Sequence, residues 1–356
     1  MRVVITGATG NVGTATIERF LSDEADHEIV GVARRRPEGG HPGVTWAQAD
    51  IARDELVSVV ADADVVIHLA WGFQPTHHPE RTWDNNVIGS LRVFDAVASA
   101  GVPALVHASS VGAYSPGPDE GTVDESWPTH SWSPAAYGRE KAYVERLLDV
   151  FELRNPDVRV VRMRPGFIFQ RPAAASQRRI FAGPLLPGSL VRPGLVPVVP
   201  DLPGFRLQAL HARDAGEAYR LAATSDVSGP FNVAADGFLD ARTLAGLLGA
   251  KVVPVPRALA RGAVSALWHA HLVPASPHLL DLALRLPIMD TARARIELGW
   301  TPTCTAGEAV AELLEGLRDG AGGDTPPLAA DAGGPARVRE VATGVGEREG
   351  VTRDGR

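Results

Sequence analysis

Residues 3–13 read VVITGATGNVG, and this stretch decides the fold of the chain. Three apolar β-branched residues lead into a turn with the spacing Gly-x-x-Gly-x-x-Gly. A helical pattern begins directly after it, with Val12, Thr16 and Phe20 four residues apart. In such a unit the glycines permit a tight turn, close approach of backbone N–H groups to a pyrophosphate, and close packing of helix on strand. The helix N-terminus adds a partial positive charge. The stretch therefore predicts a dinucleotide site, the alternative being a glycine-rich turn that binds nothing.

Short runs rich in β-branched residues alternate with helical patterns through the first half of the chain. The runs are residues 3–5, 28–32, 65–69, 104–107 and 158–163, and the helical patterns are residues 12–21, 87–98 and 136–151. Strands that are apolar throughout, separated by amphipathic helices, indicate a parallel sheet covered on both faces. Because crossovers between parallel strands are right-handed, we expect an α/β fold with a Rossmann-like, doubly wound parallel sheet.

The second half of the chain has a different character, which predicts the domain organisation. Residues 170–203 are dense in proline and glycine, as in a long lid or binding connection. Residues 320–356 contain nine glycines and no aromatic residue, and we expect a disordered tail. We expect a dinucleotide-binding domain over residues 1–165, to which the segment of about 206–235 returns. We expect a smaller substrate-binding lobe over residues 166–205 and 236–319.

Composition narrows the class of protein. The chain has 356 residues, 45% of them hydrophobic, and a formal net charge of −7, so a basic nucleic-acid footprint is missing. The single cysteine, Cys304, excludes an internal disulfide framework and a cysteine-based zinc site. His77 and His78 have no partner at metal spacing, and we expect no metal. With no membrane-length apolar run and no apolar segment before the first strand, we expect a cytoplasmic protein that binds neither membrane nor nucleic acid.

A tyrosine and a lysine four residues apart supply the strongest chemical signal. In Tyr137-Gly138-Arg139-Glu140-Lys141 the phenol and the ammonium share one helix face. The chain contains only two lysines, Lys141 and Lys251, because arginine carries its positive charge almost everywhere. A cation beside a phenol favours the ionised form, so we expect the pKa of Tyr137 to be lowered. Tyr137 would then serve as a general acid or base toward a hydroxyl or carbonyl group.

These motifs together resemble the short-chain dehydrogenase/reductase superfamily, specifically its extended, epimerase/dehydratase-type branch. The resemblance runs from residue 1 to about residue 319. Besides the glycine turn and the Tyr-x-x-x-Lys pair, it rests on four segments: Asp50-Ile51, Ile67-His68-Leu69-Ala70, Asn86-Val87-Ile88-Gly89-Ser90 and Leu298-Gly299-Trp300-Thr301-Pro302.

The resemblance implies a catalytic set of Ser110, Tyr137 and Lys141, with Ser109 as the alternative serine. The implied cofactor-binding residues are Gly7, Thr9, Gly10, Asn11, Val12, Gly13, Ala33, Arg34, Arg35, Asp50, Ile51, Leu69, Ala70, Asn86, Tyr137, Lys141, Pro165, Gly166 and Ile168. Three further residues are candidates on the substrate side. Tyr114 would line the substrate side, or it would equally fill the core. His211 either faces the substrate or does not. Arg192 would contact the substrate, although a solvated arginine is the commoner alternative. Asp214 is expected to cap a helix.

One departure from the family pattern concerns the cofactor. An enzyme that uses NAD usually places an acidic residue on the ribose 2′-hydroxyl at the end of the second strand. Here Ala33 is followed by Arg34, Arg35 and Arg36, with no acid. A guanidinium can pair with a 2′-phosphate through two hydrogen bonds. The cofactor is therefore expected to be NAD(P), with NADP(H) favoured over NAD; the alternative is a solvated arginine loop.

The reaction remains open among three classes. We favour an NAD(P)-dependent oxidoreductase that transfers hydride between nicotinamide and a secondary alcohol or ketone of a small-molecule substrate. The alternative is a nucleotide-sugar epimerase with tightly bound NAD, although Gln170 and Arg171 stand where such members often carry an asparagine. A non-catalytic, dinucleotide-sensing protein is less expected because such members typically lose the tyrosine or the lysine. The resemblance also implies a possible homodimer through the helices at 86–98 and 136–151.

Overall fold

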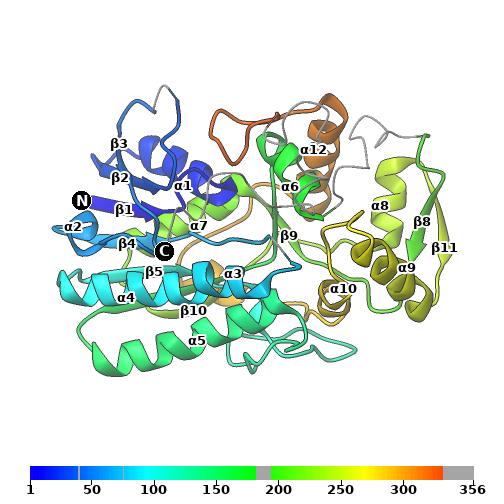
Figure 1. The fold of residues 1–356 in the computed structure, drawn as a ribbon, viewed down its shortest axis with the longest axis horizontal. Helices are drawn as coiled ribbons and strands as arrows, with labels where there is room; N and C mark the ends of the chain where they lie inside the picture. The colour runs from blue at the N-terminus through cyan, green and yellow to red at the C-terminus, as the bar shows by residue number, and fades with distance from the viewer. Residues whose placement is uncertain (39–40, 75, 182–193, 332–356) are drawn as a thin grey trace.

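The central feature is a seven-stranded sheet in which every neighbouring pair of strands is parallel. The computed structural model describes residues 1–38, 41–74, 76–181 and 194–331 (Figure 1). The strands of this sheet are β1 (Arg2–Thr6), β2 (Glu28–Ala33), β3 (Val44–Gln48), β4 (Val65–His68), β5 (Ala104–Ala108), β6 (Arg159–Pro165) and β10 (Gly229–Val233). Their order is β10-β6-β5-β4-β1-β2-β3, so the direction of winding reverses between β1 and β4. This is the doubly wound, Rossmann-like α/β fold that the sequence predicts.

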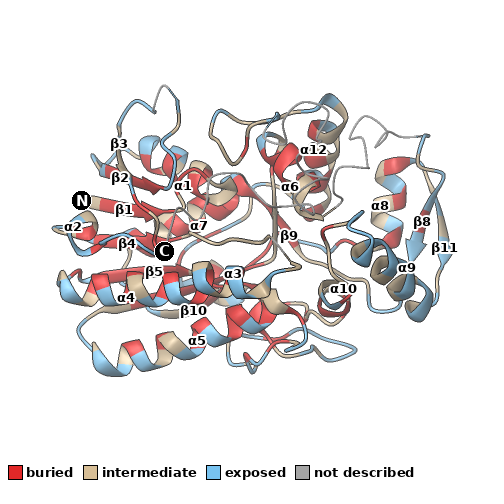
Figure 2. Ribbon diagram, in the orientation of Figure 1, coloured by how far each residue is buried: buried red, intermediate tan, exposed pale blue. Residues whose placement is uncertain are grey.

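Helices cover both faces of the sheet. Helices α1 (Asn11–Leu21) and α7 (Ala212–Thr224) lie on one face, and α2 (Val57–Val60), α4 (Gly89–Ser99) and α5 (Ala136–Arg154) lie on the other (Figure 1). Ile17, Phe20 and Tyr219 belong to the first core, and Phe94 and Leu148 to the second. The inner strands β1, β2, β4 and β5 are almost wholly buried, whereas β3 at the sheet edge is only partly buried (Figure 2). Burial on both faces explains why these inner strands are predominantly apolar.

The remaining elements form the rim of the sheet and a smaller lobe at one end of the molecule (Figure 1). This lobe carries β8 (Val198–Asp201), α8 (Ala241–Leu248), β11 (Lys251–Pro254) and α9 (Arg257–His269). Strand β7 (Phe167–Phe169) pairs with β9 (Ala209–His211), and β8 pairs with β11. The other helices and turns are α3 (Pro79–Trp83), the π-helical η1 (Asp84–Ile88), η2 (Val111–Ala113), η3 (Arg171–Ala173), α6 (Ala174–Phe181), α10 (Pro277–Ala283), α11 (Ala292–Glu297) and α12 (Ala306–Asp319).

The segment of residues 320–331 packs on the body of the protein, contrary to the disorder expected from its composition. Leu328 is 2% exposed, and the Thr325 hydroxyl donates to the carbonyl oxygen of Thr9 at 2.7 Å. The Arg179 guanidinium on α6 donates to the carbonyl oxygens of Pro327 and Ala329. One buried leucine and these hydrogen bonds order a stretch that lacks the aromatic residues of an ordinary core. Residues 332–356 of the predicted tail lie outside the described residues.

Candidate functional site

The glycine turn between β1 and α1 has the geometry of an anion cradle. Gly7 has a φ of +72°, which side chains rarely adopt. A Cβ atom on Gly13 would lie 2.4 Å from the Gly7 carbonyl oxygen, so helix and strand meet here without room for a side chain. Gly10 precedes α1, and no side chain caps the helix N-terminus. The first amides of a helix have no partner within the helix. These uncapped amides fit a pyrophosphate.

The other predicted cofactor residues around this turn lie in the turn itself, at the start of α1 or at the end of β2. The Asn11 amide group donates to the Ile168 carbonyl oxygen at 3.0 Å and therefore ties the turn to β7. Arg34 and Arg35 are exposed immediately after β2, and the described part of the chain offers neither of them a hydrogen bond or ion pair. The remaining predicted residues of this group are Thr9, which is buried, Val12, which is half-buried, and Ala33, which is buried at the end of β2.

Not every predicted cofactor residue has a free side chain. The Asp50 carboxylate accepts from the Ala52 amide at 3.0 Å, and Ile51 is buried in the core. Asn86 is fully buried, and its amide group is occupied by residues of this chain, as described below. The four other predicted residues are Leu69 and Ala70, which are half-buried just after β4, Pro165, which is buried, and Gly166, which is half-buried.

Ser110 and Tyr137 meet at the predicted catalytic centre. The Tyr137 hydroxyl donates to Ser110 Oγ at 2.8 Å, and the Gly112 amide donates to the same oxygen at 2.9 Å. Ser109 is engaged elsewhere, because its hydroxyl donates to Glu145 Oε1 at 2.6 Å. The hydrogen bonding therefore pairs the tyrosine with Ser110 rather than with Ser109.

Lys141 lies one helical turn from Tyr137 but points toward other groups. Its Nζ donates to the Ala108 carbonyl oxygen at 2.6 Å and lies 3.4 Å from the centroid of the Trp71 ring. Burial lowers the pKa of Lys141 to about 7. Burial also raises the pKa of Tyr137 to about 12, an effect that the hydrogen bond with Ser110 only partly offsets. The expectation that Lys141 lowers the pKa of this phenol is wrong for the structure, because desolvation dominates and the ammonium is directed at Ala108.

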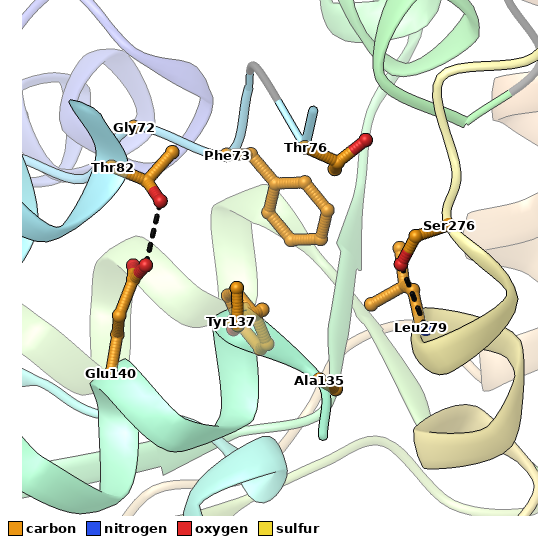
Figure 3. Close-up of a pocket in the computed structure, with 10 residues that line it drawn as sticks. Gly72, Phe73, Thr76, Thr82, Ala135, Tyr137, Glu140, Ser276 and Leu279 are labelled. Carbon is orange, nitrogen blue, oxygen red and sulfur yellow. Dashed lines mark hydrogen bonds between the residues drawn. The ribbon is translucent and has the colours of Figure 1, made fainter. Parts of the chain in front are cut away.

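A pocket opens beside Tyr137, between the loop after β4, the start of α5 and α10 (Figure 3). The Phe73 ring lies 4.7 Å from the Tyr137 ring, centroid to centroid, and 5.4 Å from the Phe181 ring. Leu279 of α10 faces them, and Glu140 supplies a carboxylate to the lining. The pocket thus combines the apolar side chains of Phe73 and Leu279 with the predicted catalytic tyrosine.

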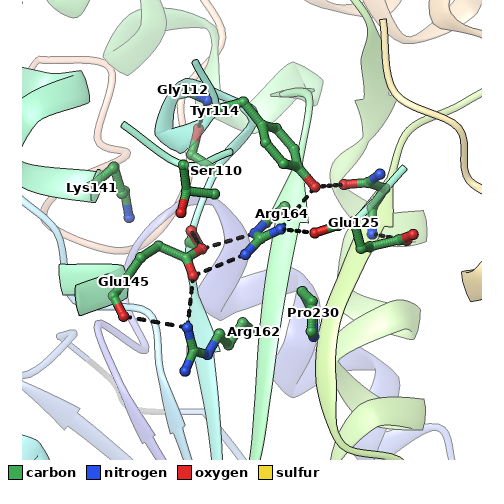
Figure 4. Close-up of polar contacts among 12 residues, drawn as sticks. Ser110, Gly112, Tyr114, Glu125, Lys141, Glu145, Arg162, Arg164 and Pro230 are labelled. Atoms are coloured by element: carbon green, nitrogen blue, oxygen red, sulfur yellow. Dashed lines mark hydrogen bonds and ion pairs between the residues drawn. The ribbon is translucent and has the colours of Figure 1, made fainter. Parts of the chain in front are cut away.

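A buried ionic network supports the turn that carries the two serines (Figure 4). Glu145 on α5 is fully buried and accepts from Arg164 at 2.9 and 3.0 Å and from Arg162 at 3.1 Å. Burial alone would raise the pKa of Glu145, but the hydrogen bonds and charge of Arg164 and the charge of Arg162 lower it to about 2. Because Glu145 also holds Ser109, the network fixes the strand end next to Ser110.

Two of the three residues predicted on the substrate side, Tyr114 and His211, are described, and they lie in different places. Tyr114 is 1% exposed, and its hydroxyl donates to Asn232 Oδ1 at 2.6 Å, so it belongs to the core. His211 Nδ1 accepts from the Arg213 amide and thereby caps α7, while its Nε2 lies 2.9 Å from Glu312. The predicted substrate-facing role of His211 has no support in this geometry. Arg192 lies outside the described residues.

The sequence predicts that Asp214 caps a helix, but this prediction is wrong, because the side chain of His211 caps α7. The Asp214 carboxylate instead accepts from the amide and hydroxyl of Thr303 and from the Cys304 amide. Its carbonyl oxygen accepts from the Trp300 indole at 2.8 Å. The residue therefore anchors the Leu298–Pro302 segment to the start of α7.

Trp71, Phe73 and Glu140 line or cover the site and were not anticipated from the sequence. Glu140 carried a usable signal, since it lies three residues after Tyr137 and therefore near the same helix face. No comparable pattern marks Trp71 or Phe73, which lie in a loop. Across the described residues no helix is long and apolar enough to span a membrane. Within the same ranges no group of three or more His, Cys, Asp or Glu side chains could hold a metal ion.

The reversal of strand order beside an uncapped, glycine-rich helix start defines a Rossmann-like, dinucleotide-binding class of protein. The sequence profile of the NAD dependent epimerase/dehydratase family matches residues 3–181. The chain belongs to this family.

Relatives of known name include a UDP-glucose 4-epimerase from Mycolicibacterium smegmatis, 26% identical over 339 residues, which cover 90% of this chain and 99% of the relative. The uncharacterized protein Rv2047c of Mycobacterium tuberculosis is 28% identical over 321 residues. That match covers 89% of this chain, but this chain spans only 30% of the length of that relative.

Solved structures with the same fold include MoeE5 in complex with UDP-glucose and NAD, with a TM-score of 0.67 and 20% identity over 90% of this chain and 99% of the other. The Thermus thermophilus UDP-glucose 4-epimerase in complex with NAD also has a TM-score of 0.67 and 20% identity. It covers 89% of this chain and 99% of its own. At this identity the likeness shows the fold alone.

Proposed function

We propose that this protein is a dinucleotide-dependent oxidoreductase that interconverts a secondary alcohol and a ketone on a small-molecule substrate. The observation that carries the proposal is the 2.8 Å hydrogen bond between the hydroxyl of Tyr137, a residue that lines the pocket, and Ser110. We assign substrate binding to the smaller lobe and to the pocket that α10 borders. Family membership supplies the dinucleotide, and the uncapped start of α1 is suited to hold its pyrophosphate.

The bound nicotinamide would supply or accept the hydride. The residues of this chain handle the proton. With a pKa near 12, the Tyr137 phenol keeps its proton at neutral pH and can donate it to an alkoxide oxygen that develops during ketone reduction. Ser110 Oγ, fixed by the Gly112 amide, would share that oxygen and orient it. Lys141, with a pKa near 7, would bind the ribose hydroxyls by turning its rotatable ammonium away from the Ala108 carbonyl oxygen.

We propose that the cofactor is NADP(H) rather than NAD. Arg34 and Arg35 follow β2 directly, where an acidic residue would otherwise accept the ribose 2′-hydroxyl. Both side chains are exposed, which suits recognition of a 2′-phosphate. Replacing both by alanine should weaken NADPH binding at least tenfold and leave NADH binding within about twofold, as measured by quenching of intrinsic fluorescence. Equal weakening of both dinucleotides would contradict this preference.

The test of the reaction uses the purified chain of residues 1–356 with NADPH and a panel of ketones and aldehydes. Tyr137→Phe should lower kcat by about 10²–10⁴-fold while leaving the nucleotide Kd unchanged, because a positioned general acid contributes that much. Arg139→Ala, an exposed change on the same helix, provides the matched control. Turnover that survives in Tyr137→Phe would refute the proposed role of the tyrosine.

A nucleotide-sugar epimerase is the second candidate, favoured by the curated UDP-glucose 4-epimerase that this chain matches over nearly its whole length. In that reaction one dinucleotide takes hydride from the sugar and returns it, so the cofactor need not exchange. Nucleotide released by denaturing freshly purified protein separates the candidates. Near-stoichiometric NAD, together with interconversion of UDP-glucose and UDP-galactose, would establish the epimerase. Empty protein that binds NADPH ahead of NADH would support the reductase.

We also propose a homodimer formed through α4 and α5. Their outer faces expose large apolar side chains, namely Leu91, Tyr143, Val150 and Leu153. Leu153 is the most exposed of them, at 83%, and exposed apolar patches mark interaction surfaces. Light scattering coupled to size-exclusion chromatography should give twice the chain mass for the wild type and the chain mass for Leu153→Glu. A wild-type monomer would refute the dimer.

A further inference from the structure

Glu140 is a buried carboxylate at the wall of the pocket, one residue before Lys141. It is 1% exposed, and the described part of the chain contributes two hydrogen bonds to it. Thr82 donates its hydroxyl to Oε1 at 2.6 Å, and Asn86 donates its amide group to Oε2 at 2.7 Å (Figure 3 shows the Thr82 contact). A carboxylate that is withdrawn from water persists only where hydrogen bonds compensate it. Packing alone therefore does not explain why a carboxylate is buried at position 140.

Asn86 links Glu140 by hydrogen bonds to the loop that follows β4. The same Asn86 amide group donates to the Gly72 carbonyl oxygen at 2.7 Å, and the Gly72 amide donates to Asn86 Oδ1 at 2.6 Å. Both backbone groups of Gly72 are thus bonded to one side chain. A Cβ atom on Gly72 would lie 2.9 Å from the Asn85 amide nitrogen, so the loop lies directly against the π-helical turn. Such turns are frequent at functional sites.

The residues on either side of Gly72 cover the two predicted catalytic side chains. The Trp71 ring lies over Lys141 Nζ, 3.4 Å from ring centroid to nitrogen. The Phe73 ring packs on the Tyr137 ring at 4.7 Å, and Trp71 meets the same ring edge-on at 6.1 Å. We refer to residues 71–73 as the aromatic cover.

We propose that Glu140 is a positioning residue that, through Asn86, holds the aromatic cover over Tyr137 and Lys141. The Glu140 carboxylate accepts the amide proton of Asn86, which fixes the orientation of that amide, and the orientation fixes Gly72. The cover then keeps water from the phenol and the ammonium. The effect on catalysis rests on the proposed function, whereas the effect on the loop does not.

Two substitutions separate position from charge. In Glu140→Gln the new carbonyl oxygen can accept from Asn86, and the new amide can donate to Thr82 Oγ1. The Thr82 hydroxyl can then direct its single proton to the Pro79 carbonyl oxygen, 3.0 Å away. Glutamine thus preserves the anchor without the charge. Glu140→Ala removes the anchor, and Glu80→Ala, at an exposed position on α3, is the control.

The experiment measures amide hydrogen exchange in the aromatic cover together with turnover. Glu140→Ala should speed exchange of the residue 71–73 amides at least tenfold and lower kcat 10–100-fold, with the nucleotide Kd within twofold of wild type. Glu140→Gln and Glu80→Ala should retain wild-type exchange and at least a third of kcat. If Glu140→Ala does not fold, Glu140→Asp takes its place, since its shorter side chain cannot reach both donors.

Two results would overturn the proposal. One is wild-type exchange at residues 71–73 in Glu140→Ala. The other is a loss of protection in Glu140→Gln as large as in Glu140→Ala, which would assign the effect to charge. A protein that shows no turnover in any form contradicts the proposed function, and the exchange measurement then decides the role of Glu140 by itself.

Discussion

Replacing Glu145 by glutamine should destabilise the protein with little change in shape. The carboxylate accepts four hydrogen bonds, one from Ser109, two from Arg164 and one from Arg162 (Figure 4). Glutamine has nearly the same volume, but its amide nitrogen is a donor and would face the guanidinium donors. The two arginines would also lose their fully buried counter-charge.

The size of the effect follows from the pKa of Glu145, which falls from 4.5 to about 2 on folding. Each unit by which the folded pKa lies below the unfolded one corresponds to about 1.4 kcal/mol, so the contribution is about 3 kcal/mol at neutral pH. Loss of one partner from a buried ion pair typically costs about 3–5 kcal/mol, which agrees. Because the folded pKa is depressed, the contribution is complete above pH 4.5 and is lost as the pH falls toward 2. At pH 3.5 about 2 kcal/mol should remain.

Urea denaturation of wild type and Glu145→Gln at pH 7, 5.5 and 3.5 measures this difference. The gap in unfolding free energy should be constant between pH 7 and 5.5 and smaller at pH 3.5. Glu152→Gln is the matched control, because Glu152 pairs with the same Arg162 but is partly exposed, and it should cost less than about 1 kcal/mol. A Glu145→Gln protein within about 0.5 kcal/mol of wild type at pH 7 would refute the reasoning.

Three further outcomes are expected. Ser110→Ala should lower kcat by about 10²-fold, as loss of an oxyanion donor does. Ser109→Ala should retain turnover and lose about 1–3 kcal/mol of stability. Steady-state kinetics and thermal unfolding distinguish the two variants, and the reverse pattern would exchange the roles of the two serines. Leu328→Ala should cost about 2 kcal/mol in urea denaturation, because the leucine is 2% exposed, and a silent change would show that the segment is not packed in solution. Gly13→Val should abolish dinucleotide binding in calorimetry, since a Cβ atom there would lie 2.4 Å from the Gly7 carbonyl oxygen, and retained binding would contradict the cradle.

The sequence predicted those helices, strands and turns that are specified by their own residues rather than by contacts with distant segments. The β-branched run of β1 and the glycines after it specify strand, turn and helix without reference to the rest of the chain. Helix α5 likewise follows its apolar spacing, and Tyr137 and Lys141 lie on it as expected. Strand β3 was missed because its residues are only partly buried at the sheet edge, so its apolar pattern is weak.

The features that could not be predicted depend on contacts between distant segments. The pKa of Tyr137 depends on burial by Trp71 and Phe73, which come from a loop more than sixty residues earlier in the sequence. The packing of residues 320–331 depends on Arg179, and composition contains no record of that partner. Local spacing suggested Asp214 as a helix cap, but its carboxylate is hydrogen-bonded to Thr303 and Cys304. The neighbouring His211 caps α7 instead.

The hydrogen bond from Thr325 to Thr9 joins residues 316 positions apart. In a chain synthesised from its N-terminus, the glycine turn leaves the ribosome 316 residues ahead of Thr325. The strand–turn–helix that suits a pyrophosphate can therefore meet nucleotide before Thr325 is made. We expect the tie to Thr325 to secure a turn that has already formed.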